Sequence, residues 1–419
     1  MTRTSLGTGL LFVAAALLSA GVAEAQTKPT GQTKSKRGET VLTRPRPEVD
    51  PLGIRVGSFL LFPKLTLEQS YNDNIYATND DETDDFITNI RPEVSLESDW
   101  TNHALALAAG LDQGLYFSND NADYTDWFTR ATGRLDVTRD INVQGGAGFK
   151  RAHEDPDDPN FGGGEYPEYY FQTDAFLRYN QQFGRFLATV DGTFARLDYE
   201  NAKGGIQNQD RDINIFQGGV RVGYEFQPNY QAFVRASGNR RVYDTTPDDA
   251  GRTRDSSGYA VVTGLAVDLT GVLFGDVFVG YREQFYDNSA EDDFSGPTFG
   301  LSLGWNVTPL TTITTRVEQT IQETTDNNAS AYVLTVGSLS VDHELLRNLL
   351  LNANGSIGQE DYEGDSRTDM IYTAGFGIRY LMNRHFYASL AYRFSERDGD
   401  NSTDDYSQNI VRIGLEGQF

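Results

Sequence analysis

The chain lacks cysteine, and beyond its N-terminus it lacks any long apolar run. With no cysteine in 419 residues, disulfide frameworks and thiolate sites are excluded. No run after residue 25 approaches the roughly 18 apolar residues of a membrane-spanning helix. If the chain sits in a membrane, it therefore spans as strands. A formal net charge of −25 argues against a nucleic-acid partner, because little would neutralise the phosphates.

Catalytic and metal-binding patterns are also missing. Of the four histidines, three lie at short connections and His153 begins a long one. There is no G-x-S-x-G motif, and no base stands beside a nucleophile as covalent catalysis requires. The clusters Asp80 to Asp85 and Asp155 to Asp158 offer oxygen ligands for calcium, but their spacing matches no calcium loop. We interpret them as solvated loop acids and predict no enzyme, no cofactor and no metal site.

The N-terminus indicates export. Arg3 precedes the apolar run LGTGLLFVAAALLSA, and Ala23 to Ala25 (AEA) offers small residues for a signal peptidase. We predict a signal peptide over residues 1–25 of a Gram-negative chain. Residues 26–55 carry seven basic and three acidic side chains and are predicted to form a basic periplasmic leader. Residues 26–40 of this leader are expected to be flexible. The three prolines of residues 41–55 indicate an extended chain there.

From residue 56 onward, short segments alternate between apolar and polar residues, which is typical of antiparallel strands. In MIYTAGFGIRYLM, aromatic and apolar side chains share one parity, opposite Arg379. The last segment, VRIGLEGQF, sets Val411, Ile413, Leu415 and Phe419 on one face. An apolar face that repeats over so many strands favours lipid as its surroundings.

The connections between these segments alternate in kind, eight short and nine long, acidic and glycine-rich. This pattern predicts an all-β fold for residues 56–419: a transmembrane antiparallel up-and-down β-barrel of about 18 strands. Each strand supplies roughly the 9–11 residues that a tilted strand needs to cross the hydrocarbon. Closure leaves no unpaired edge in lipid.

An even strand count places both termini and the short turns on the periplasmic side of the outer membrane. The long acidic loops then face outside, next to lipid and lipopolysaccharide. The terminal Phe419 is predicted to be the signal that the barrel-insertion machinery recognises.

Charged residues on the opposite parity are expected to line the lumen and to tune its selectivity. The alternative is that they pair with one another and fill the interior. The candidates are Arg178, Arg221, Arg282, Arg316, Arg379, Arg393, Arg412, Asp174, Glu225, Glu318 and Glu416.

The most distinctive segment is VLTRPRPEVDPLGIRVGSFLLFPKLTLEQSYNDNIYAT, residues 41–78. It resembles the start of the outer-membrane beta-barrel porin 2 family of proteobacteria. That family is often associated with capsular or extracellular polysaccharide systems. The resemblance implies passage or export across the outer membrane, with polysaccharide as the favoured cargo, and it assigns no functional residue.

Two functions remain open from the sequence. One is a channel for polysaccharide export or for small hydrophilic solutes. The other is a structural or surface-interaction barrel with a closed lumen and partner-binding acidic loops. The basic leader adds a further hypothesis: it enters the acidic barrel from the periplasm, or it docks to a periplasmic polysaccharide-export component.

Overall fold

The computed structural model describes residues 38–201, 208–248, 251–269, 271–288, 293–325, 329, 331–400 and 404–419. The predicted signal peptide and residues 26–37 of the leader lie outside this part of the chain. No helix in the described ranges is long and apolar enough to span a membrane. The structure consists of strands, with two short 3-10 turns at Asp120–Ala122 and Gln209–Arg211.

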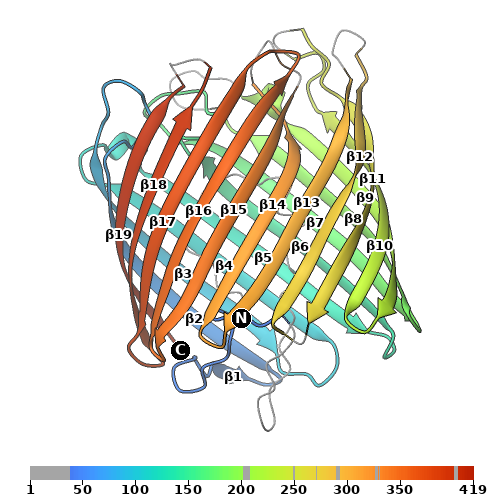
Figure 1. The fold of residues 1–419 in the computed structure, drawn as a ribbon. Helices are drawn as coiled ribbons and strands as arrows, with labels where there is room; N and C mark the ends of the chain where they lie inside the picture. The colour runs from blue at the N-terminus through green and yellow to red at the C-terminus, as the bar shows by residue number, and fades with distance from the viewer. Residues whose placement is uncertain are drawn as a thin grey trace.

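Eighteen strands form a closed antiparallel ring, as predicted (Figure 1). The ring runs in chain order and closes where β19 pairs with β2, from Ile410 opposite Asn72 to Gln418 opposite Lys64. The strands are β2 (Phe59–Asn72), β3 (Asp85–Ser98), β4 (Ala104–Tyr116), β5 (Tyr124–Asp136), β6 (Ile141–Glu154), β7 (Glu168–Phe183), β8 (Phe186–Tyr199), β9 (Ile213–Gln227), β10 (Tyr230–Tyr243), β11 (Ser256–Leu269), β12 (Leu273–Tyr286), β13 (Phe294–Thr308), β14 (Thr311–Gln322), β15 (Ala331–Leu346), β16 (Leu349–Glu363), β17 (Thr368–Leu381), β18 (Phe386–Asp398) and β19 (Tyr406–Gln418).

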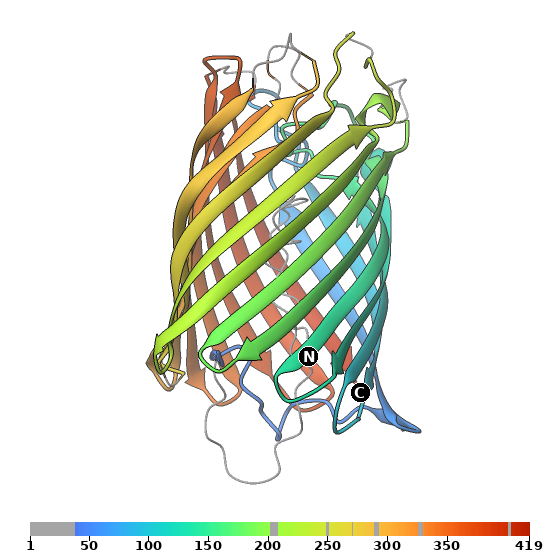
Figure 2. The ribbon, with the colours of Figure 1, turned by 90° about the vertical axis from the view of Figure 1, so that its right-hand side faces the viewer.

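A further strand, β1 (Ile54–Val56), lies outside the ring and pairs only with β2. The ring strands are longer than predicted, from 12 residues in β14 to 16 in β7 and β15. A strand of 9–11 residues already crosses the hydrocarbon. The strands therefore extend beyond the apolar layer, and Figure 2 shows how steeply they tilt.

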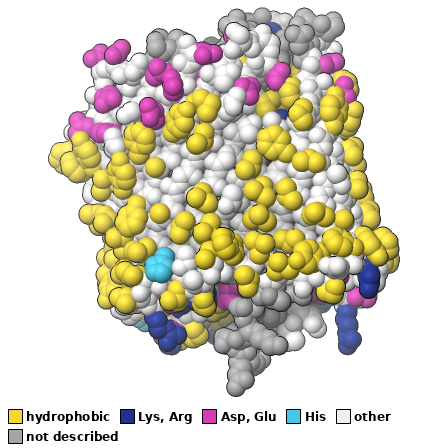
Figure 3. Space-filling view, in the orientation of Figure 1, with side chains coloured by type: hydrophobic (Ala, Val, Ile, Leu, Met, Phe, Trp, Pro, Cys, Tyr) yellow, Lys and Arg dark blue, Asp and Glu magenta, His cyan; other side chains and the backbone are white. Residues whose placement is uncertain are grey.

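The outer wall is apolar because side chains of one parity face away from the ring. On β9, Val220 and Val222 are each 48% exposed, while the next residue of opposite parity points inward. Figure 3 shows hydrophobic side chains around the middle of the visible face and acidic side chains towards one end. This surface is suited to lipid, since an ordinary soluble protein does not expose so large an apolar area.

The two ends of the barrel differ, and we name them by their connections. At the short-turn end, adjacent strands are joined by tight turns such as Gly184–Arg185 between β7 and β8, where Gly184 has a φ of +60°. At the long-loop end, connections such as residues 155–167 are much longer. The described chain starts and ends at the short-turn end, where the Phe419 amide donates to the Pro63 carbonyl (3.2 Å).

One seam of the ring is incomplete. Strands β13 and β14 share seven residue pairs, from Leu301 opposite Val317 to Thr308 opposite Thr311. Residues 294–300 of β13 and 318–322 of β14 have no partner across this seam, although each still pairs with its other neighbour. In Figure 1, β14 curves away from β13 towards the long-loop end.

Candidate functional site

The lumen is the candidate site, because the polar parity of every strand faces it. The structure places the eleven charged candidates on this parity. The exposed apolar side chains that flank them, such as Leu177, Tyr281 and Tyr392, lie on the outer wall. The inward set is Arg178, Arg221, Arg282, Arg316, Arg379, Arg393, Arg412, Asp174, Glu225, Glu318 and Glu416.

Only one ion pair joins two of these candidates. Arg379 on β17 contacts Glu416 on β19 at 2.8 Å, two strands away. The other paired arginines have partners that were not among the lumenal candidates. These pairs are Arg221 with Asp276 (3.9 Å), Arg393 with Asp157 (3.5 Å) and Arg412 with Glu68 (4.0 Å).

The remaining candidates are not brought together. Among the described residues, Arg178, Arg316, Asp174 and Glu318 form no ion pair, and Arg316 is exposed to the lumen. Glu225 lies at the short-turn end, where it accepts a hydrogen bond from the Asn229 amide (3.0 Å).

Arg282 is the exception among the unpaired arginines because it is only 7% exposed. It lies over the Phe294 ring, 5.0 Å from its centroid, and donates to the Gln319 carbonyl (3.4 Å). Its surroundings belong to the incomplete seam between β13 and β14.

The first insert in the lumen is the docked leader, residues 38–53. Val41 is fully buried, and with Val49 it packs against Leu350, Leu381 and Tyr387 on the inner wall. The sequence predicted a flexible and then extended chain here. Instead, this segment forms hydrogen-bonded turns, because apolar side chains and backbone groups both find partners on the wall.

A buried ion pair and several hydrogen bonds hold the docked leader. Arg46, 4% exposed, contacts Glu344 on β15 at 2.8 Å. The Val41 amide donates to the Thr312 hydroxyl (2.9 Å), and the Tyr387 hydroxyl donates to the Val49 carbonyl (2.7 Å). The leader thus narrows the lumen along one side of the short-turn end.

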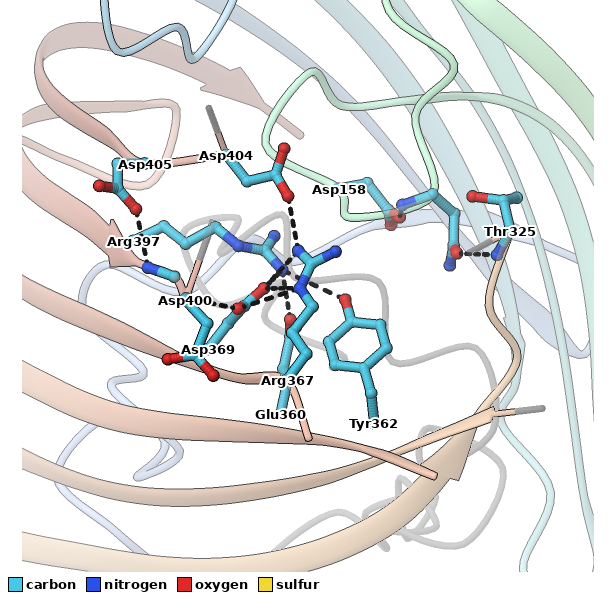
Figure 4. A network of polar contacts seen from close by, with 12 residues as sticks. Asp158, Thr325, Glu360, Tyr362, Arg367, Asp369, Arg397, Asp400, Asp404 and Asp405 are labelled. Carbon is cyan, nitrogen blue, oxygen red and sulfur yellow. Dashed lines mark hydrogen bonds and ion pairs between the residues drawn. The ribbon is translucent and has the colours of Figure 1, made fainter. Parts of the chain in front are cut away.

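The second insert is the inserted loop, residues 155–167, between β6 and β7. Asp157 contacts Arg393 on β18, and β6 and β18 lie far apart around the ring. The Asn160 side chain donates to the Glu323 carbonyl (3.2 Å) and accepts from the Thr325 amide (2.9 Å). The loop therefore crosses the lumen near the long-loop end, as Figure 4 shows around Asp158 and Thr325.

The interpretation of this acidic cluster as solvated is wrong for Asp157 and Asp158. The Asp157 side chain is 16% exposed, and burial together with the charge of Asp155 raises its pKa to about 6. Burial, followed by the nearby Glu154 charge, raises the pKa of Asp158 to about 8. The sequence does not predict this burial, because acidic loops are usually exposed and no residue pattern within the loop indicates that it folds into the lumen.

The wall around the inserted loop is densely charged. Arg211, from the β8–β9 connection, contacts Glu154 at 2.6 Å. Asn208 donates to Glu168 (2.7 Å). Between the inserted loop and the wall remains a cavity of about 80 Å³, room for a few waters at most. The loop and wall therefore close this side of the lumen.

A second charged network faces the loop from β16–β19 (Figure 4). Arg397 is 4% exposed and contacts both Glu360 and Asp369, the latter at 2.8 Å. Arg367 binds the same aspartate at 2.6 Å and also binds Asp404 at 2.7 Å. None of these residues was a candidate from sequence. Arg367, Asp369, Arg397 and Asp404 fall in segments that the sequence predicts as long acidic loops, and nothing in these segments indicates which residues pair.

The comparisons with known proteins bear on the family. A family model described as "Putative beta-barrel porin 2" matches residues 46–419. The chain belongs to this family. The predicted resemblance is therefore confirmed, and it covers the whole barrel and part of the docked leader. The protein is a porin-like barrel of the outer membrane. No curated protein matches the chain.

Some solved structures are similar to the chain at low sequence identity. OpdO of Pseudomonas aeruginosa is 13% identical, with 87% of this chain and 98% of that chain covered and a TM-score of 0.46. The copper transporter OprC is 9% identical, with 88% and 84% covered and a TM-score of 0.47. A bacterial polysaccharide outer membrane secretin is 10% identical, with 85% and 98% covered and a TM-score of 0.37.

Proposed function

We propose that this protein is a channel for hydrophilic molecules, with polysaccharide as its cargo. The observation that carries the proposal is the set of tyrosines on the inward parity of the wall. The outer wall exposes phenylalanines, such as Phe216 and Phe376, as well as tyrosines, such as Tyr392. Apart from Phe233, the buried aromatics of the described residues are all tyrosines: Tyr170, Tyr243, Tyr286, Tyr332, Tyr362, Tyr387 and Tyr406.

Tyrosine suits a sugar-conducting lumen because it combines an apolar ring face with a hydroxyl donor. Arginines add to this lining: Arg211 lies over the Tyr199 ring (4.1 Å) and Arg379 over Tyr387 (5.0 Å). The family's association with polysaccharide systems supports the same cargo.

In this proposal the short-turn end, with both termini, faces the periplasm, and the acidic loops face outward beside lipopolysaccharide. The docked leader then lies where a periplasmic export component would meet the barrel. Phe419, 56% exposed and 5.1 Å from the His385 ring, remains available as a signal for the insertion machinery. No catalytic role is proposed.

The second candidate is a barrel with a closed lumen that binds a partner through its acidic loops. The two inserts favour it, because the docked leader and the inserted loop each occupy part of the lumen.

Single-channel recording in planar bilayers separates the two functions. A channel gives discrete current steps, and acidic oligosaccharides added to one side reduce them by entering the lumen. A neutral oligosaccharide of the same length is the control. A stronger block by the acidic one would show that the lumenal arginines recognise its charge. Silent bilayers from protein shown to be folded by its heat-modifiable mobility in gels would overturn the channel and favour the closed barrel.

A further inference from the structure

The incomplete seam between β13 and β14 is at odds with the rule for strands in lipid. Every backbone group of a barrel needs a partner there, because hydrocarbon supplies none. We call residues 294–300 of β13 and 318–322 of β14 the split seam, since no pairing joins them. All other neighbours in the ring share at least nine residue pairs. The split seam is therefore the weakest part of the wall.

The sequence weakens the ladder at this point. Pro297 lies within the split part of β13, and proline has no amide hydrogen to donate. Prolines are tolerated in sheets mainly on edge strands. Gly296 and Gly300 flank it, so this part of β13 has few side chains to pack against a neighbouring strand.

Lumenal arginines take the place of the missing strand. Arg282 on β12 donates to the Gln319 carbonyl (3.4 Å), and Arg241 on β10 donates to the Ile321 carbonyl (3.1 Å). Both carbonyls belong to the part of β14 without a β13 partner. The edge of β14 is thus stabilised from inside the barrel while it stays separate from β13.

The outer wall beside the split seam is apolar. Val279 and Tyr281 on β12 are 59% and 46% exposed, and Phe299 on β13 is 39% exposed. The register places Val279 opposite Phe299 and Tyr281 opposite Pro297. The seam therefore separates a lipid-facing surface from an arginine-lined lumen.

Arg282 also keeps unused donors. It is 7% exposed, and its Nε and Nη2 atoms have no hydrogen-bond partner among the described residues. A buried guanidinium with free donors is a site for an oxyanion, which it binds through two parallel hydrogen bonds.

We propose that the split seam is a lateral opening between the lumen and the lipid leaflet at the long-loop end, and that an anionic lipid occupies it. The acidic headgroup binds Arg282, and the acyl chains pass between β13 and β14 to the apolar surface around Phe299. This site is separate from the axial route along the barrel and does not depend on the proposed channel.

Paired cysteines test whether the seam is open in a membrane, because the chain has no cysteine of its own. If the ladder continued in register, Thr298 would lie opposite Thr320. The matched control is Ser302 with Arg316, which are paired in the structure and four residues further along on the same face. We expect Ser302→Cys/Arg316→Cys to oxidise readily and Thr298→Cys/Thr320→Cys to stay reduced. Equal oxidation of the two pairs would overturn the opening.

Photocrosslinking tests the occupant. A benzoylphenylalanine replaces Thr320 at the seam or, as a control, Ser356, which faces the lumen between two fully paired strands. Folded protein is selected by heat-modifiable mobility and placed in vesicles with labelled phosphatidylglycerol or labelled phosphatidylcholine. We expect several-fold more lipid capture at position 320 than at 356. Equal capture at both positions would refute a lipid in the seam.

The role of Arg282 has its own readout. Arg282→Gln is expected to lower the capture of phosphatidylglycerol at position 320 severalfold while leaving phosphatidylcholine capture unchanged. Arg178→Gln, a lumenal arginine on β7, which is not a neighbour of β13 or β14, should change neither. Unchanged phosphatidylglycerol capture in Arg282→Gln would exclude headgroup recognition by this residue. Because none of these measurements records current, they remain informative even if bilayers are silent.

Discussion

At the scale of single residues, the inward-facing arginines are of two kinds: some are exposed to the lumen, and others are buried in ion pairs. Arg316 is on the inward parity and exposed, whereas Arg46 and Arg397 are each 4% exposed and paired. The alternation of the sequence predicts which side of the wall a residue faces. It does not predict the Arg46 partner, because Glu344 lies 298 residues away and only the closed ring brings the two together.

We predict that Arg46→Ala releases the docked leader. Removing one member of a buried ion pair costs about 3–5 kcal/mol when the other stays buried. Undocking lets water reach Glu344, so this figure is an upper bound. Even a loss of about 1.4 kcal/mol in the free energy of docking lowers the equilibrium constant for docking about tenfold. Endoproteinase Glu-C, which cleaves after Glu48, should therefore cut the variant faster by about tenfold or more.

The matched control for this measurement is Arg55→Ala. Arg55 pairs with Asp99 at 2.6 Å, but its side chain is 55% exposed, and exposed pairs contribute about 0–1 kcal/mol. Cleavage after Glu48 should stay at the rate of the parent protein. Similar rates for Arg46→Ala and Arg55→Ala would show that the ion pair with Glu344 does not hold the leader.

At the scale of elements, the period-two pattern predicted the strands and their number, because lipid outside and water inside impose that period on every strand. It also separated short from long connections. The period-two pattern did not predict the segments that fold into the lumen instead of joining the ring of strands. The inserted loop and the docked leader are held by contacts with distant strands, such as Asp157 with Arg393. The split seam had a local signal in Pro297, whose meaning depends on knowing which strand lies beside it.

We predict that the inserted loop loosens as pH rises. Asp158 has a pKa of about 8 in the docked loop and about 4 in water, so docking binds its proton more tightly. Its contribution to docking is complete below about pH 4, falls as pH rises and is lost above about pH 8. Channel conductance measured between pH 4 and 9 should therefore increase with pH.

Asp158→Asn separates this group from the other carboxylates of the lumen. Asparagine resembles the protonated acid, so the loop should stay docked at high pH and the conductance should remain low. Asp120→Asn, in a different loop at the same end, should follow the parent protein. A pH profile of Asp158→Asn identical to that of the parent would show that another group controls the loop.

At the scale of the whole molecule, the two inserts lie at opposite ends of one lumen. The docked leader contacts the wall at the short-turn end, through Val41 and Arg46. The inserted loop crosses the lumen near the long-loop end, through Asp157 and Asn160. An ion that passes along the axis meets both, so their electrical resistances add in series. The larger of the two resistances dominates the current.

Deleting residues 26–50 and shortening residues 156–164 to a glycine-serine turn test this arrangement singly and together. With resistances in series, removing one insert raises the conductance only until the other limits it. The double variant should therefore gain more conductance than the sum of the two single gains. Single-channel recording in potassium chloride measures all four proteins, each first shown to be folded by its heat-modifiable mobility. Gains that simply add would place the inserts on parallel routes, and no gain in any variant would show that neither insert restricts the axis.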